Sequence, residues 1–255
     1  MGLAAAALLL VAVPASVQDT STPTACSGAD ERMRDLFHQE ARVAVAQVPG
    51  RGSASTGHLL RVEPGSTNAT FFTLASLVAH ASAKQRVSTV CQTGLNTGVS
   101  AAALLCATGN HVTLDSYDIA SHWYINSTER ALNRLYPGRH TLTKGSSLDT
   151  VPQRVHRCDF VFVDGGHSFK LAFADLYNFR NLSRGSTVVV DNCNVNGRTR
   201  PFGAMLGVNR AFREAVRRGL VQHAEQRTAG ACARHAQIIE GVAAQCGELC
   251  VAKFT

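Results

Sequence analysis

The chain has 255 residues, of which 45% are hydrophobic and 17% are charged. This balance excludes a disordered protein and allows one α/β domain with some residues in front of it. The formal net charge of +7 does not predict a nucleic-acid-binding protein, because the basic residues are scattered and form only short groups such as Arg217 and Arg218.

Residues 1–17 contain an apolar run, MGLAAAALLLVAVPAS, that is too short to span a bilayer comfortably and ends in small residues near Ala15. We expect a secretory leader that is removed, after which no stable membrane insertion remains. The protein would then lie in the lumen of the secretory pathway or outside the cell. No Lys or Arg precedes the apolar run, so an uncleaved signal anchor is the alternative.

Cysteines and glycosylation sequons favour the same compartment. The chain has 8 cysteines, some of which would form disulfides in an oxidising lumen. Cys232, Cys246 and Cys250 crowd the C-terminus, and a Cys232–Cys246 bond would brace the long segment between the last two strands. The connectivity is not fixed by the sequence, and no cysteine spacing is typical of a zinc site. Sequons begin at Asn68, Asn126 and Asn181.

The polarity pattern divides the chain into four parts. Residues 1–17 form the leader, the polar residues 18–30 predict a linker, and residues 31–85 predict N-terminal helices that pack on a core. From residue 86 to residue 255 the pattern repeats as strand, turn and helix. We interpret 86–255 as the main domain.

Strands that alternate with helices indicate a parallel sheet, because a parallel connection needs a crossover. Residues 158–164 and 186–192 are apolar almost throughout, which is typical of strands covered on both faces. Residues 220–226 and 248–254 predict a closing antiparallel hairpin. The predicted fold is α/β: a Rossmann-like, doubly wound sheet, mostly parallel, with helices on both faces and an antiparallel hairpin at the C-terminal end.

Glycines follow the first strand of this domain. Gly94 and Gly98 stand between a strand and a helix, where the missing Cβ lets a ligand approach the backbone. The spacing G-x-x-x-G differs from the G-x-G-x-x-G of a dinucleotide site and favours S-adenosylmethionine over NAD. An ordinary tight turn is the alternative. The next strand ends at Asp118, which is placed to accept hydrogen bonds from ribose hydroxyls; Asp115 is a second candidate for that role.

Oxygen-bearing side chains end two further strands. Asp164 ends one of them, and Asp191 and Asn192 end the other. Carboxylate and amide oxygens suit Mg²⁺, which we prefer, or Ca²⁺. Adjacent strands lie about 4.8 Å apart, so these side chains can hold one ion. The alternative is that Asp191 and Asn192 only cap a turn.

His167 follows Asp164 closely enough to face the same site. An imidazole that titrates near neutrality can remove a proton from an acceptor hydroxyl. The alternatives are that His167 only hydrogen-bonds Asp164 or stacks on a cofactor. Lys170 is a second candidate base, although on a helix it is expected to point to solvent.

With these motifs in order, residues 86–255 resemble class I S-adenosylmethionine-dependent methyltransferases, and within them the metal-dependent O-methyltransferases of the catechol and caffeoyl-CoA type. The run from Gln92 to Ser100 is similar to the family motif E-x-G-x-x-x-G-x-S. KGSSLDTVPQ, at 144–153, is similar to the segment that packs against adenine in the catechol enzyme. FVDGGHSF also resembles a broader D-G-x-H group whose relatives include sugar O-methyltransferases.

The resemblance implies cofactor-binding, metal-binding and catalytic residues. Gln92 departs from the family pattern, which has Glu there, and His167 replaces the lysine base. The implied metal ligands are Asp164, Asp191 and Asn192, and the implied catalytic residues are His167 and Asp164. The implied cofactor-binding residues are Gln92, Gly94, Asn96, Gly98, Ser100, Asp118, Ser147 and Asp164.

The expected function is therefore methyl transfer from S-adenosylmethionine to a hydroxyl of a small molecule or glycan, assisted by a divalent metal. A secreted, non-catalytic binding module that keeps the fold is the alternative. An NAD-dependent oxidoreductase is discounted by the glycine spacing and by the lack of a suitably placed Tyr-x-x-x-Lys pair. The sequence leaves the oligomeric state open.

Overall fold

The computed structural model describes residues 26–29, 31–33, 35, 36, 39, 66–193, 204–228 and 248–255. The expected leader, most of the expected linker, and Cys232 and Cys246 lie outside these residues. Within the part of the chain that is described, no helix is both long and apolar enough to cross a membrane. The elements that position the site are α3 (Ser66–Lys84), β1 (Thr89–Thr93), α4 (Val99–Cys106), β2 (Thr113–Asp118), α5 (Ile125–Leu135), β3 (His140–Lys144), α6 (Ser147–Thr150), a 3-10 helix (Val151–Gln153), β4 (Phe160–Val163), α7 (Phe169–Arg180), β5 (Thr187–Asp191), α8 (Ala204–Arg217), β6 (Val221–Thr228) and β7 (Glu248–Phe254).

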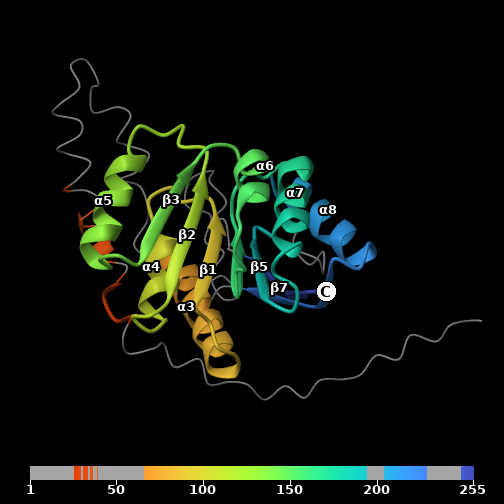
Figure 1. The fold of residues 1–255 in the computed structure, drawn as a ribbon, viewed down its shortest axis with the longest axis horizontal. Coiled ribbons are helices and arrows are strands. Elements are labelled where there is room, and N and C mark those ends of the chain that lie inside the picture. Colours follow the sequence, from red (N-terminus) through yellow and green to blue (C-terminus); the bar gives the residue numbers. More distant parts are fainter. Residues whose placement is uncertain are drawn as a thin grey trace, which may run out of the picture.

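A 7-stranded sheet forms the centre of the described chain, in the order β3-β2-β1-β4-β5-β7-β6 (Figure 1). Strands β1 to β5 pair in parallel, whereas β7 pairs antiparallel with both β5 and β6. The crossovers that parallel pairing requires are supplied by α4, α5 and α7. The predicted Rossmann-like fold and its closing hairpin are confirmed.

Alternate residues of each strand pack into two separate cores, because successive side chains point to opposite faces of a sheet. Phe160 and Phe162 of β4 pack with α3, α4 and α5. Val161 and Val163 pack with α7 and α8 on the other face. All four side chains are almost fully buried, which explains the nearly continuous apolar run of β4. In Figure 1, α6, α7 and α8 lie side by side, away from α5.

Three disulfides join the described cysteines. Cys26–Cys106 ties the N-terminal segment to the end of α4. Cys91–Cys158 joins β1 to the residues that precede β4, and Cys193–Cys250 joins the end of β5 to β7. Cys250 therefore pairs outside the C-terminal group in which the sequence placed it, and the Cys232–Cys246 bond lies outside the described residues.

The first disulfide also shortens the expected linker. Cys26 and Ala29 fall inside 18–30, yet both are buried in one core together with Met33. The linker was predicted from small polar residues, which cannot reveal a covalent attachment to α4. The packed part of the chain already includes Cys26.

Peptide mapping of the unreduced, denatured protein is expected to recover the three linked peptide pairs. The bonds close loops with sequence separations of 80, 67 and 57, and in the chain-entropy account each stabilises the fold by about 4 kcal/mol. Reduction should therefore lower the unfolding midpoint strongly. Alkylation of Cys91 or Cys158 without prior reduction would contradict the pairing.

Candidate active site

The turn between β1 and α4, Gly94 to Gly98, needs glycine at both ends. Gly94 has a φ of +81°, and a Cβ there would lie 2.0 Å from the carbonyl oxygen of Asp164. Gly98 has a φ of +80°, and its Cβ would lie 2.8 Å from Thr128 Cγ2. These distances explain the two glycines by packing. The short distance at Gly94 also shows that the turn packs directly against Asp164, which follows β4 at the carboxyl edge of the sheet.

Asp118 holds this turn from the end of β2. One carboxylate oxygen accepts hydrogen bonds from the backbone N–H of Leu95 at 2.7 Å and of Asn96 at 3.3 Å, and the other accepts from Ala120 N–H at 2.7 Å. Each oxygen has two lone pairs, so Asp118 can still accept from a ligand hydroxyl. Asp115 instead bonds to His156 at 2.6 Å. Of the two acidic residues, Asp118 is the one at the turn.

Asn96 is exposed in the middle of the turn and has a φ of +46°. Its side-chain oxygen accepts a hydrogen bond from the Tyr124 hydroxyl at 2.5 Å, and its carbonyl accepts one from the Thr128 hydroxyl at 2.9 Å. Burial raises the pKa of Tyr124 to about 12, so this hydroxyl keeps its proton near neutrality. The turn is therefore fixed from the α5 side as well.

Gln92 is buried below the turn in a chain of polar groups. Its amide donates to Ser116 Oγ at 2.9 Å, and its oxygen accepts from Ser100 Oγ at 3.4 Å. Ser116 lies 2.9 Å from His140 Nε2, and burial lowers the pKa of His140 to about 4, so the whole chain is neutral. A neutral Gln suits these partners better than the Glu of the family motif. Its predicted cofactor contact stays a prediction, because the buried side chain reaches the turn only through Ser100.

The two carboxylates predicted at separate strand ends come together. Asp164 and Asp191 lie close enough for their carboxylates to influence each other's titration. Burial raises the pKa of Asp164, and burial together with the charge of Asp164 raises that of Asp191. Asp191 Oδ1 is buried without a hydrogen-bond partner. Asp164 keeps 32% of its side chain exposed, so the pair is reachable from solvent.

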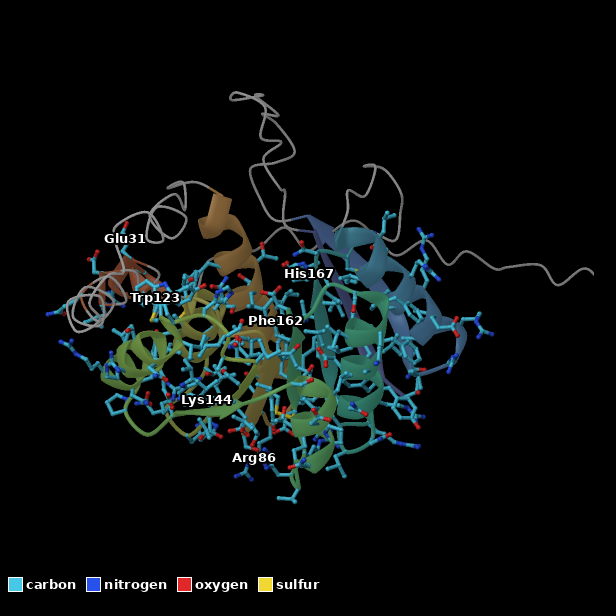
Figure 2. All side chains as sticks on the ribbon, turned by 90° about the horizontal axis from the view of Figure 1, so that it is seen from above. Glu31, Arg86, Trp123, Lys144, Phe162 and His167 are labelled. Carbon is cyan, nitrogen blue, oxygen red and sulfur yellow. A yellow bond between two sulfur atoms is a disulfide. The ribbon has the colours of Figure 1, made fainter. Side chains whose placement is uncertain are left out.

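Asn192 and His167 flank this pair. Asn192 has a φ of +57°, and its amide donates to the Asp191 carboxylate. His167 Nε2 lies 3.8 Å from Asp164 Oδ1, and the interaction with the Asp164 carboxylate raises the pKa of His167. His167 lies near the centre of Figure 2, between the green and the blue parts of the ribbon. The predicted base thus lies next to the predicted metal ligands, whereas nothing links the exposed Lys170 to them.

Comparisons with known proteins bear on the family and on the fold of the chain. Residues 91–193 match the family model of a methyltransferase domain. This segment, less than half of the chain, is therefore similar to a methyltransferase domain. The match spans the glycine turn, Asp118 and the carboxylate pair, and it confirms the resemblance drawn from the sequence. None of the curated proteins matches the chain.

Solved structures extend the likeness to most of the chain, with the fold of S-adenosylmethionine-dependent O-methyltransferases. An O-methyltransferase from Bacillus cereus in complex with SAH has a TM-score of 0.58 at 16% identity, covering 88% of this chain and 90% of that one. The O-methyltransferase TomG from Streptomyces achromogenes, in complex with SAM, has a TM-score of 0.55 at 19% identity, covering 91% and 90%. A SAH-bound methyltransferase from Podospora anserina has a TM-score of 0.54 at 13% identity, covering 91% and 88%.

Sequence reasoning missed one acidic residue of the methyltransferase domain. Asp175 on α7 is fully buried, and the hydroxyls of Ser147 and Thr93 interact with its carboxylate. Ser147 begins α6, a helix that the sequence did not predict because it has only 4 residues. The sequence pattern could have indicated Asp175. It falls on the same buried, mostly apolar stripe of the helix as Ala172, Leu176 and Phe179, where a charged residue is unusual.

A pocket of about 660 Å³ opens beside the glycine turn. It is lined by residues that follow β2, by the start of α5 and by Lys144. Figure 2 shows Trp123 and Lys144 in the yellow-green half, away from His167. The pocket therefore lies beyond the Asp118 end of the site and not over the carboxylate pair. Its lining consists of Ala120, Ser121, His122, Trp123, Ile125, Asn126 and Lys144.

A second cluster with metal-ligand chemistry lies outside the site. Ligand atoms of Cys91, Asp115 and His156 lie within 4.8 Å of one another. The Cys91 sulfur is bonded to Cys158 and offers no thiolate to a metal. The remaining Asp115–His156 pair is a surface ion pair, so this cluster does not compete with the Asp164–Asp191 pair.

Proposed function

We propose that this protein is an S-adenosylmethionine-dependent O-methyltransferase that acts on a hydroxyl of a small molecule or glycan with the help of a divalent metal. The observation that carries the proposal is the meeting of three features at one edge of the sheet. These are the glycine turn held by Asp118, the Asp164–Asp191 pair and His167. The proteins of the same fold that hold SAM or SAH support the choice of cofactor.

The residues present fit a divalent cation. Two adjacent, partly buried carboxylates with raised pKa values repel each other when both are ionised, and Asp191 Oδ1 lacks a partner. A hard cation would satisfy both, so Asp164, Asp191 and Asn192 would hold Mg²⁺ by preference, or Ca²⁺. When bound, such a cation lowers the pKa of the acceptor hydroxyl and stabilises its oxyanion.

The residues also fit the cofactor, which supplies the electrophilic methyl group. Gly94 and Gly98 let the turn pack closely against Asp164 and Thr128, and Asp118 retains one lone pair for a ribose hydroxyl. Asn96, Ser100 and Ser147 offer polar groups from α4, α6 and the turn itself. Holding both reactants in one site contributes by orientation and proximity.

His167 accepts the proton of the acceptor hydroxyl in this proposal. Only the neutral imidazole can do so, and the interaction with Asp164 raises the pKa of His167. The neutral form therefore grows as the pH rises above that raised pKa. His167 is exposed, so the proton can pass on to solvent.

We further propose that the protein acts in an oxidising compartment of the secretory pathway or outside the cell. Three disulfides among the described cysteines support this proposal. The non-catalytic alternative is not favoured, because the proposed base and metal ligands are brought together.

Isothermal titration is the first test of this function. The protein is expected to bind S-adenosylmethionine and SAH, and Asp118→Ala should weaken both at least tenfold, because charge-assisted hydrogen bonds contribute about 1.5–3 kcal/mol each. Glu214→Gln removes a surface carboxylate of α8 that pairs with Arg217 and Arg218 and should leave both affinities unchanged. Absence of cofactor binding with and without Mg²⁺ would end the proposal. Binding without transfer of labelled methyl to any catechol or glycan tested would favour the non-catalytic alternative.

A further inference from the structure

Asp175 is a buried carboxylate that the proposed mechanism does not use. It lies on α7 and is 0% exposed. Neither of its oxygens has a hydrogen-bond partner of good geometry. Burying an ionisable group in this way costs free energy that a neutral side chain of the same shape would not. Such a residue calls for an explanation other than stability.

The carboxylate lies where three segments of the candidate site meet. A Cβ on Gly165 would lie 3.1 Å from Thr93 Oγ1 and 3.2 Å from Asp175 Oδ2. Thr93 precedes Gly94 of the glycine turn, and Gly165 follows Asp164. Ser147, whose hydroxyl also interacts with Asp175, begins α6. Asp175 therefore lies directly beneath the segments that carry the proposed cofactor residues.

The charge of Asp175 is not balanced by its neighbours. Burial raises its pKa to about 6, opposed by the hydroxyls of Ser147 and Thr93, and no charged group contributes to this shift. The carboxylate is therefore ionised at pH 8. In a poorly polarisable interior its field is screened far less than that of a surface carboxylate.

We propose that Asp175 is a specificity residue that favours S-adenosylmethionine over SAH, through the negative charge it places beneath the site. The inference rests on the proposed function. During transfer the S–CH₃ bond breaks, the sulfur keeps the electron pair, and the O–CH₃ bond forms. The sulfonium charge thereby disappears. An unbalanced carboxylate below the site favours the cationic reactant and loses that interaction with the neutral product.

Asp164 and Asp191 are two further carboxylates of the candidate site, and they differ from Asp175 in two respects. Their carboxylates influence each other's titration, and a bound cation would offset their charge. In the part of the chain that is described, no hydrogen bond or ion pair joins Asp175 to either of them, and Asp175 is not a candidate metal ligand. Its charge would therefore persist whether or not the metal is present.

The test compares the affinities of wild type and Asp175→Asn for S-adenosylmethionine and for SAH, by calorimetry at pH 8. Asparagine keeps the shape and removes the charge. The affinity for S-adenosylmethionine is expected to fall about tenfold, as for a charge pair at intermediate effective dielectric, while the affinity for SAH changes less than about twofold. Glu214→Gln removes a surface carboxylate of α8 that pairs with Arg217 and Arg218 and should leave the ratio of the two affinities unchanged.

Two outcomes would overturn this inference. If Asp175→Asn weakens both ligands equally, Asp175 only shapes the site; if it alters neither, its charge does not reach the cofactor. If neither ligand binds to the wild type, the proposed function itself fails, which is a distinguishable result. The melting temperature of the variant at pH 8 should equal or exceed that of the wild type. If the variant does not fold, Asp175→Ser removes the same charge and gives the same comparison.

Discussion

Replacing Asp191 with asparagine is expected to weaken Mn²⁺ binding, used as a probe of the metal site, and to reduce methyl transfer by roughly 100-fold or more. Asp191 Oδ1 is buried and has no partner, so the cation would be its main stabilising contact. Removing one of two carboxylates halves the charge that attracts a divalent ion. Paramagnetic resonance titration with Mn²⁺ measures the first effect without any acceptor.

Glu214→Gln is the matched control for this change. Glu214 is a carboxylate of α8 paired with Arg217 and Arg218, and it has no contact with the site. The control should bind Mn²⁺ as the wild type does. Equal Mn²⁺ affinity of Asp191→Asn and the wild type would show that Asp191 is not a ligand.

Gly94→Ala is expected to have the largest effect on folding among single changes in the turn. The new Cβ would lie 2.0 Å from the Asp164 carbonyl oxygen, and the residue would keep a φ of +81°. Backbone atoms would have to move, at a cost of roughly 3 kcal/mol or more in the free energy of unfolding. Chemical denaturation measures this cost, and calorimetry should show loss of cofactor binding.

Gly138→Ala is the control that separates the cost of a positive φ from the cost of the steric overlap at Gly94. Gly138 has a φ of +71°, and a Cβ there would meet nothing within 4 Å. This control should cost only about 1 kcal/mol and leave cofactor binding intact. Equal destabilisation by the two substitutions would mean that the close approach between the turn and β4 does not exist.

The ends of the strands were predictable because residues adjacent in the sequence mark them. An apolar run followed by glycine or aspartate marks the carboxyl end of a buried strand, and parallel pairing brings these ends to one edge. Gly94, Asp118, Asp164 and Asp191 follow from that rule. The choice between Asp115 and Asp118 did not, because alternation along β2 leaves open which side chain meets the turn; the hydrogen bonds to the turn decide it.

Features that depend on distant pairing were not predictable in the same way. The partners of Cys91 and Cys250 depend on which strands lie side by side, and the residues around each cysteine do not indicate the strand order. The burial of Gln92 follows from Ser116 and His140 on β2 and β3. Asp175 was visible as a charged residue on an apolar helical stripe, but its neighbours Thr93 and Ser147 come from other elements.

The Cys26–Cys106 bond has a consequence for the integrity of the polypeptide. Cys26 is joined to the last residue of α4, the helix that begins at the glycine turn. Hydrolysis of any single peptide bond between residues 40 and 65 would therefore yield two fragments that stay covalently joined. Such a nicked protein should migrate as one species in a non-reducing gel and separate into two only after a thiol reagent is added.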